Sequence, residues 1–266
     1  MRILIIGIQG MLGYNLYKYL TSNRYNIFGT IRNNKKMDDY NIFSLEHTEN
    51  NLIDLFQKVN PTIIINCIAK LKETSLIQKN EMIYSNCTLP IFVADYCNKN
   101  NIYFIHFSSD AVFKSSDNYN SIKDNYSPES FYGLTKCISE SISKTALVLR
   151  ICPIGYDKYG NKSLFNFIYN NKSKDLNGYT NCIFNGITID VIANQIIKII
   201  ESNNKLYGIH HITGPKISKY DLLQVINKKF NLNKNIIPID MPNICRLLED
   251  DLVDTSKLNW KSLNYI

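Results

Sequence analysis

The sequence lacks any long apolar run. Hydrophobic residues make up 45% of its 266 positions, yet no stretch approaches the roughly 18 residues that a membrane-spanning helix needs. The apolar residues 2–6 are interrupted by Gly7, and no small-residue cleavage site of a secretory signal follows. We therefore expect a cytoplasmic protein that is not inserted in a membrane.

The sequence also lacks the spacings of a disulfide framework or a zinc site. Its seven cysteines include no Cys-x-x-Cys pair, and their number is odd. Scattered cysteines in apolar surroundings are typical of reduced core thiols. The four histidines show no ligand spacing, so we expect no bound metal.

A block of basic residues is missing as well. The formal net charge is +7, but the lysines are spread among asparagines without an aromatic-basic repeat. This pattern indicates a solvated surface rather than a nucleic-acid interface. A modest positive balance also suits an anionic small-molecule substrate.

What is present is an alternation of apolar strands and helical patterns over about 150 residues, which predicts an α/β fold with a Rossmann-like, doubly wound parallel sheet. Beyond residue 155 the alternation loosens. We therefore expect an NADP-binding domain at 1–155 and a smaller, mainly substrate-binding lobe at 156–266 that packs on it and can return elements to it. The expected strands lie at 2–6, 25–30, 62–66, 102–107, 145–152 and 208–212, and the clearest helices at 52–59, 80–99 and 188–201.

A glycine-rich turn follows the first strand. Gly7, Gly10 and Gly13 enclose Gln9, Met11 and Leu12, and a helical pattern begins directly afterwards. Glycines permit a tight turn and a close approach of backbone to pyrophosphate, while the helix N-terminus faces the negative charge. The segment therefore predicts a dinucleotide cofactor.

The second strand has no acidic residue at its end, where an NAD-preferring site usually binds the adenosine 2′-hydroxyl. It ends instead in Thr30-Ile31-Arg32. Thr30 can donate a hydrogen bond and Arg32 can pair with a 2′-phosphate. NADPH is favoured and NADH stays possible, since Arg32 is also compatible with an ordinary solvated loop.

Tyr132 and Lys136 are four residues apart, so on a helix both side chains lie on one face. We expect the ammonium to lower the pKa of the phenol, which would suit carbonyl/alcohol interconversion. Ser109 and Asp110 fall at the end of a predicted strand, where open α/β sheets place ligands. A Ser109 hydroxyl there could bind the reacting carbonyl, although a turn or helix cap is the structural alternative.

Together these motifs resemble the extended short-chain dehydrogenase/reductases, and within them the dTDP-4-dehydrorhamnose reductase family. His106–Phe113 is similar to that family's Ser-Thr-Asp-Tyr-Val-Phe stretch, with Ser109 in place of the catalytic threonine, and Tyr132–Lys136 matches its Tyr-Gly-x-x-Lys. The resemblance implies that Lys136 contacts the cofactor ribose. It places five further residues near the cofactor, namely Cys67, Ile68, Ala69, Asn86 and Pro153, and makes Asp110, Ala111 and Asn185 candidate substrate contacts.

Departures from related patterns help to choose the reaction. Ala111 replaces the usual aromatic residue, and Ser44-Leu45 stands where many relatives carry an acidic residue near the adenine. Ala111 also breaks the acidic pair of sugar-nucleotide 4,6-dehydratases, and Asp110 occupies the position of the cysteine of fucose-type epimerase-reductases.

The resemblance therefore implies NADPH-dependent reduction of the 4-keto group of a nucleoside-diphosphate 4-keto-6-deoxyhexose. It also allows a homodimer. The alternatives are an epimerase or epimerase/reductase on the same fold, a non-catalytic NADP-binding regulatory subunit, and a nucleic-acid binder.

Overall fold

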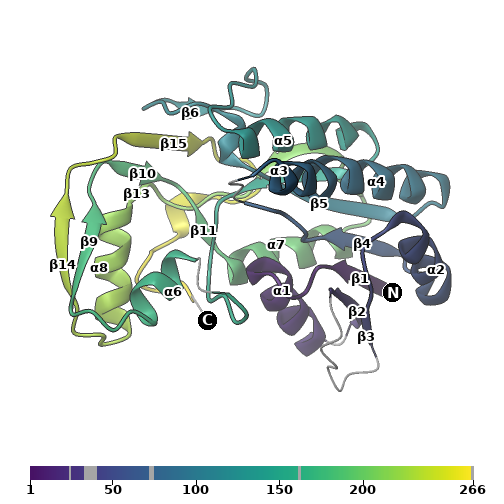
Figure 1. Cartoon of the computed structure of the whole chain (residues 1–266), viewed down its shortest axis with the longest axis horizontal. Helices are drawn as coiled ribbons and strands as arrows, with labels where there is room; N and C mark the ends of the chain where they lie inside the picture. The colour runs from purple at the N-terminus through teal and green to yellow at the C-terminus, as the bar shows by residue number, and fades with distance from the viewer. Residues whose placement is uncertain (24, 33–40, 72–74, 161–162, 265–266) are drawn as a thin grey trace.

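The computed structural model describes residues 1–23, 25–32, 41–71, 75–160 and 163–264. Its main sheet has seven strands, all parallel, in the order β12-β7-β5-β4-β1-β2-β3, as Figure 1 shows. The predicted doubly wound sheet is therefore confirmed. The strands are β1 (Arg2–Ile6), β2 (Asn26–Ile31), β3 (Ile42–Ser44), β4 (Ile63–Asn66), β5 (Tyr103–Ser109), β7 (Leu147–Ile151) and β12 (Gly208–His211).

Helices cover both faces of this sheet (Figure 1): α1 (Met11–Ser22) and α7 (Ile189–Glu201) on one, and α2 (Glu49–Val59), α4 (Leu89–Lys99) and α5 (Phe131–Ser139) on the other. Strand side chains alternate between faces, and residues 3–6 of β1 are apolar and buried on both faces. Ile3 and Ile5 belong to the core beneath α1 and α7, whereas Leu4 and Ile6 belong to the core beneath α2 and α4. The strand order reverses at β1, which pairs with β2 and with β4. Ligands bind at such a switch point, outside the carboxyl ends of the strands.

The prediction of one continuous helix over 80–99 is wrong. The segment forms α3 (Leu76–Ile83), a π-helical turn at Tyr84–Thr88, and α4. Pro90 has no N–H and cannot donate to the carbonyl of Asn86 four residues earlier, so the regular ladder is interrupted here. The wide turn leaves Asn86 buried and facing α5.

The C-terminal half forms a second layer that exchanges elements with the first. Its four-stranded sheet has the order β13-β10-β15-β6, and β14-β9 and β11-β8 form separate pairs. From this half, β12 forms an edge of the main sheet and α7 packs against that sheet. Conversely, β6 (Tyr119–Asn120) comes from the N-terminal half and forms an edge of the four-stranded sheet. The remaining elements are β8 (Pro153–Ile154), α6 (Leu164–Tyr169), β9 (Asp175–Tyr179), β10 (Cys182–Phe184), β11 (Ile187–Thr188), β13 (Ile217–Ser218), α8 (Lys219–Lys229), β14 (Asn235–Ile239) and β15 (Ile244–Leu248).

The strand β6 lies inside the polar, turn-rich segment 115–130. The sequence predicts no strand there, because the pairing partner of β6 is remote in sequence. Tyr119 pairs with Leu247 and Asn120 with Leu248, and the N–H of Ser116 donates to the carbonyl of Cys245 at 2.7 Å. The segment thus bridges the two layers just before α5 begins.

All seven cysteines are free, as the sequence predicts. Within the described parts of the chain, no helix combines the length and apolarity that crossing a bilayer requires.

Candidate active site

The carboxyl ends of β1, β4, β5 and β7 meet at one edge of the main sheet, and the glycine turn lies there. Gly7 directly follows β1, and its N–H donates to the Thr30 hydroxyl at the end of β2 at 3.0 Å. Gln9 bridges the same two segments, since its side-chain oxygen accepts from the N–H of Arg32 at 3.2 Å. Met11 and Leu12 form the first turn of α1. Cys67, Ile68 and Ala69 follow β4 beside this turn, and the N–H of Cys67 donates to the carbonyl of Ile6 at 2.9 Å.

The three glycines of the turn differ in whether the fold itself excludes a side chain at their positions. Gly7 has φ +90°, and a Cβ there would lie 2.6 Å from Ile68. A Cβ on Gly13 would collide with the carbonyl oxygen of Gly7. A Cβ on Gly10 would meet no protein atom closer than 3.7 Å, and its φ is an ordinary −79°. The fold therefore does not explain Gly10, but a ligand group at the N-terminus of α1 does. No described side chain caps that helix end, so its N–H groups fit a pyrophosphate.

Tyr132 lies in the first turn of α5, which begins at the Ser130 cap; the Ser130 hydroxyl accepts from the N–H of Gly133 at 2.9 Å. The Ser109 hydroxyl at the end of β5 lies beside the Tyr132 phenol, and hydrogen bonding from it favours the charged form of the phenol. Gly133 makes this approach possible, because a Cβ there would collide with the carbonyl oxygen of Ala111. The structure therefore brings Ser109 and Tyr132 together, as the sequence predicts.

Lys136 is almost fully buried, with 2% of its surface exposed. Its ammonium donates to the carbonyl of Phe107 at 2.8 Å. Burial lowers the pKa of Lys136 to about 8, and the opposing charge of Glu140 limits that shift. Burial disfavours the charged form of Lys136, and the carboxylate of Glu140 favours it.

The expected lowering of the phenol's pKa by Lys136 is wrong for this structure. Burial raises the pKa of Tyr132 above its ordinary value, and the charges of Asp110 and Cys152 raise it further, while the hydrogen bond with Ser109 opposes the shift. The partly buried phenol loses solvation of its charged form, and Lys136 is not among the groups that shift its pKa. Tyr132 is thus a protonated donor.

Asp110 lies next to these groups. The Ser109 hydroxyl donates to its carboxylate at 2.9 Å. Burial raises the pKa of Asp110, whereas the Ser109 hydrogen bond and the charge of Arg246 lower it. Arg246 comes from β15 and is held by the Phe113 carbonyl at 3.2 Å and the Glu129 carboxylate at 2.9 Å. No local sequence signal identifies Arg246, because only the tertiary fold brings β15 to this edge.

The hydroxyl of Thr30, a predicted cofactor contact, is engaged within the protein. Its side chain is fully buried, and its hydroxyl is paired with the Gly7 N–H and with His47 at 2.7 Å. The side chain points beneath the glycine turn because it lies within β2 rather than beyond it. Arg32, one residue past β2, is exposed. His47 is a residue that sequence reasoning missed; burial and the charge of Arg32 lower its pKa to about 4.

Two predicted asparagines are engaged within the protein. Asn86 accepts from the N–H of Lys70 at 2.8 Å and donates to the Thr135 hydroxyl at 3.0 Å. Asn185 donates to the carbonyl of Leu248 at 2.7 Å and accepts from its N–H at 3.0 Å. Asn185 thus holds β15, and its amide is not directed at a substrate. Pro153 lies in β8, where its pairing partner is Ile187.

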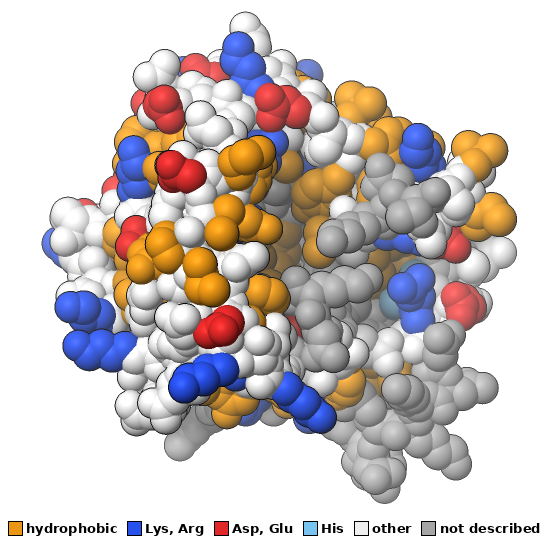
Figure 2. Space-filling model, turned by 60° about the vertical axis from the view of Figure 1, so that its left-hand side comes forward, with side chains coloured by type: hydrophobic (Ala, Val, Ile, Leu, Met, Phe, Trp, Pro, Cys, Tyr) orange, Lys and Arg blue, Asp and Glu red, His pale blue; other side chains and the backbone are white. Residues whose placement is uncertain are grey.

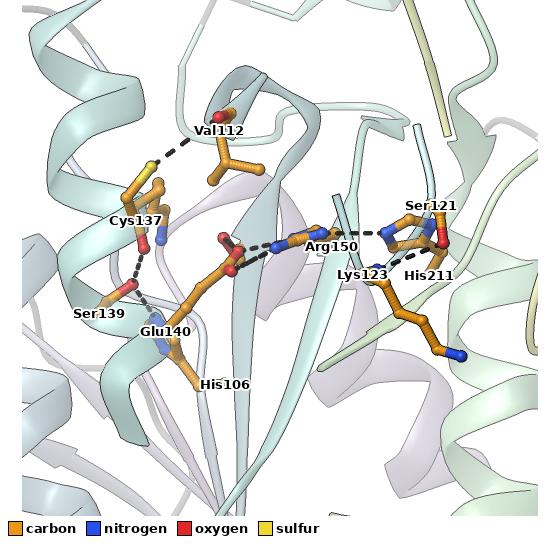
Figure 3. Close-up of polar contacts among 11 residues, drawn as sticks. His106, Val112, Ser121, Lys123, Cys137, Ser139, Glu140, Arg150 and His211 are labelled. Carbon is orange, nitrogen blue, oxygen red and sulfur yellow. Dashed lines mark hydrogen bonds and ion pairs between the residues drawn. The ribbon is translucent and has the colours of Figure 1, made fainter. Parts of the chain in front are cut away.

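A buried ion pair that sequence reasoning missed lies behind β5. The guanidinium of Arg150 contacts both carboxylate oxygens of Glu140, with the closest distance 2.7 Å, and the Ser108 hydroxyl donates to the same carboxylate at 2.5 Å. Arg150 also contacts His211 at 3.3 Å (Figure 3). Glu140 lies four residues after Lys136, a spacing that could have suggested a role beside the lysine.

Comparison with known proteins identifies a family for this chain. The model described as the RmlD substrate binding domain matches residues 1–249 of the chain. The probable low-salt glycan biosynthesis reductase Agl14 of Haloferax volcanii is 25% identical over 154 residues, which cover 55% of this chain and 51% of that protein. The match thus spans about half the length of this curated relative.

Solved structures agree on the fold. The dTDP-4-dehydrorhamnose reductase of Bacillus anthracis in complex with NADP superposes with a TM-score of 0.81 at 19% identity, covering 98% of this chain and 95% of that one. The L-threonine 3-dehydrogenase of Trypanosoma brucei also reaches 0.81, at 15% identity, covering 98% and 94%. At such identities the likeness establishes the fold alone, since one fold carries many activities.

Proposed function

Because the chain belongs to the RmlD substrate-binding domain family, a branch of the extended short-chain dehydrogenase/reductases, we propose that it is an NADPH-dependent reductase. Its substrate is the 4-keto group of a nucleoside-diphosphate 4-keto-6-deoxyhexose. The observation that carries this proposal is the placement of the Ser109 hydroxyl beside the Tyr132 phenol. This pair lies at the sheet edge that also holds the glycine turn, so a proton donor and a dinucleotide site share one crevice.

In this mechanism the dihydronicotinamide supplies the hydride when it is bound. Tyr132, protonated because burial raises its pKa, gives its proton to the oxygen that becomes the alcohol. The Ser109 hydroxyl binds that oxygen, and Lys136 would contact the ribose of the bound cofactor. Donors aimed at an oxygen where charge develops lower the barrier more than donors that bind the substrate equally well.

The cofactor's pyrophosphate would lie over Gly10 and the N-terminus of α1, where the absence of a side chain leaves room. The preference for NADPH rests on Arg32, which is exposed beyond β2. Its guanidinium can form paired, charge-assisted hydrogen bonds with a 2′-phosphate. Since Thr30 is occupied within the protein, Arg32 alone of the predicted pair is available for this contact.

The nucleotide part of the substrate would bind a cavity of about 600 Å³ between α6, β9 and α8. Phe167 and Tyr179 offer ring faces for a base, and Asn177 offers an amide. Lys219 lines the same cavity, and its ammonium can pair with a phosphate of the substrate. Figure 2 brings this side of the molecule forward and shows a hollow near its middle with hydrophobic side chains along it.

An epimerase/reductase is a second candidate because of Cys152. As a thiolate, this residue would raise the pKa of Tyr132. A thiolate there could remove a proton next to the ketone. However, burial raises the pKa of this thiol well above its ordinary value, and a protonated thiol is a poor base. Reduction without epimerisation is therefore the better assignment.

The test is an NADPH-oxidation assay against a panel of nucleotide-linked 4-ketosugars, with the product configuration read by NMR. Tyr132→Phe should lower kcat by about 10²-fold or more, as expected for loss of a positioned acid, with NADPH affinity little changed. Full turnover by this variant would show that the assignment of Tyr132 is wrong. NADPH binding without turnover of any ketosugar would instead favour a regulatory subunit.

A further inference from the structure

The segment Asn66–Lys70, which begins with the last residue of β4, is tied to the helix α5 by a buried chain of hydrogen bonds. The N–H of Ile68 donates to the side-chain oxygen of Asn66 at 3.1 Å, and the Asn66 amide reaches Nδ1 of His106 at 3.2 Å. On the other side of the ring, Nε2 of His106 is 3.2 Å from the Ser139 hydroxyl (Figure 3). That hydroxyl donates to the backbone carbonyl of Lys136 at 2.8 Å. His106 is thus the link between the two ends.

Only one form of the ring satisfies all these partners. The Asn66 oxygen is taken by the Ile68 N–H, so its NH₂ group must donate and Nδ1 must accept. Ser139 donates to Lys136, so its oxygen must accept from Nε2–H. The ring is therefore neutral with its hydrogen on Nε2. Burial and the charge of Lys136 keep the pKa of His106 well below its ordinary value, which preserves that form.

A second chain runs parallel to the first through Asn86. This residue holds both backbone groups of Lys70, at 2.8 and 3.0 Å, and donates to the Thr135 hydroxyl at 3.0 Å. Thr135 in turn donates to the backbone carbonyl of Tyr132 at 2.7 Å. The carbonyls of both proposed catalytic residues, Tyr132 and Lys136, are therefore held by chains that begin in the same segment after β4.

We infer that His106 is a positioning residue that couples the cofactor-side segment Asn66–Lys70 to the catalytic helix α5. Cofactor contacts on that segment and the placement of Lys136 then depend on one imidazole that touches neither substrate nor cofactor. The inference rests on the proposed function, because it assumes that the segment contacts the cofactor and that α5 carries the reacting groups.

The test compares His106→Gln with His106→Leu. Glutamine can accept from Asn66 and donate to Ser139, whereas leucine of similar bulk can do neither. In the leucine variant, kcat should fall by about tenfold or more, since small displacements of reacting groups are costly, and the Kd for NADPH should rise by about threefold or more. Glutamine should restore most of both quantities, which a purely space-filling role would not do.

Ser139→Ala provides an independent arm that removes one hydroxyl, and it serves even where the leucine variant does not fold. It should lower kcat while leaving the Kd for NADPH near the wild-type value, because the link from His106 to Asn66 remains. Equal behaviour of the glutamine and leucine variants, or wild-type kcat in Ser139→Ala, would overturn the inference. Where the wild-type enzyme reduces no ketosugar, the NADPH affinities of the two His106 variants still test the coupling separately from the proposed function.

Discussion

Glu140 and Arg150 form an ion pair with 2.7 Å between Oε2 and Nη2, and their side chains are at most 1% exposed. The pair joins the end of α5 to β7, while Ser108 and His211 bind its two ends. Arg150 also lies over the ring of Phe113 at 4.8 Å. A charge left alone in such a place has no water to solvate it.

Glu140→Gln should therefore lower the free energy of unfolding by about 3–5 kcal/mol, the usual cost of breaking a buried pair. Urea denaturation measures this quantity. The matched control is Asp95→Asn, which removes the exposed i,i+4 pair with Lys99 and should change stability little. Similar effects of the two substitutions would contradict the prediction.

The pH dependence of turnover should reveal Lys136. Its pKa is lowered to about 8 by burial, so the ammonium is lost as the pH rises through that value. Because the proposed chemistry needs the charged form, kcat/KM should fall on the alkaline side of about pH 8. Initial rates across neutral and alkaline pH test this, and a profile that stays flat there would be inconsistent with the assignment.

Stability should respond to the same group in the opposite direction. Between about pH 8 and the ordinary value of 10.5, unfolded Lys136 binds more protons than folded Lys136, so its contribution to stability rises with pH. Buried tyrosines and cysteines with raised pKa values act the other way, so the informative quantity is the difference between wild type and Lys136→Met. Urea denaturation at several pH values should show the wild type gaining on the variant; a constant difference would count against the lowered pKa.

Gly10 and Gly13 should separate cofactor binding from folding. Gly10→Ala adds a Cβ with ordinary contacts, so the melting temperature should hold or rise slightly while NADPH affinity falls. Gly13→Ala drives a Cβ into the Gly7 carbonyl, and overpacking of this kind costs about 1–3 kcal/mol. Thermal melts and NADPH titrations measure both effects. Unchanged NADPH affinity in Gly10→Ala would show that the pyrophosphate does not bind at this turn.

Arg32 should decide between the two cofactors. Arg32→Ala should weaken NADPH binding on the order of tenfold, the scale of a lost charge-assisted contact, and leave NADH binding unchanged. Arg2→Ala is the control, since that arginine lies at the opposite, amino end of β1. The Kd values for both cofactors provide the measurement, and an equal loss for NADH would show that Arg32 does not read the 2′-phosphate.

Local patterns predicted the parts of the fold that depend on nearby residues. The continuous apolar run of β1, the glycine turn and the i,i+4 pair Tyr132 and Lys136 all lie where the sequence predicts them. Patterns failed where a distant partner decides the outcome. β6 forms only because β15 lies beside it, and the Thr30 hydroxyl has Gly7 and His47 as its partners.

By itself, the sequence determined the strand–turn–helix order, the family motifs and the identity of the proposed acid, amine and alcohol, because hydrophobic periodicity and glycine chemistry act over a few residues. Only the tertiary structure decided the electrostatics of those groups. Burial sets the pKa values of Tyr132 and Lys136, and the chains through His106 and Asn86 join strands and helices far apart in sequence. Solvent exclusion and hydrogen-bond partners are properties of the packed chain, so no local pattern could supply them.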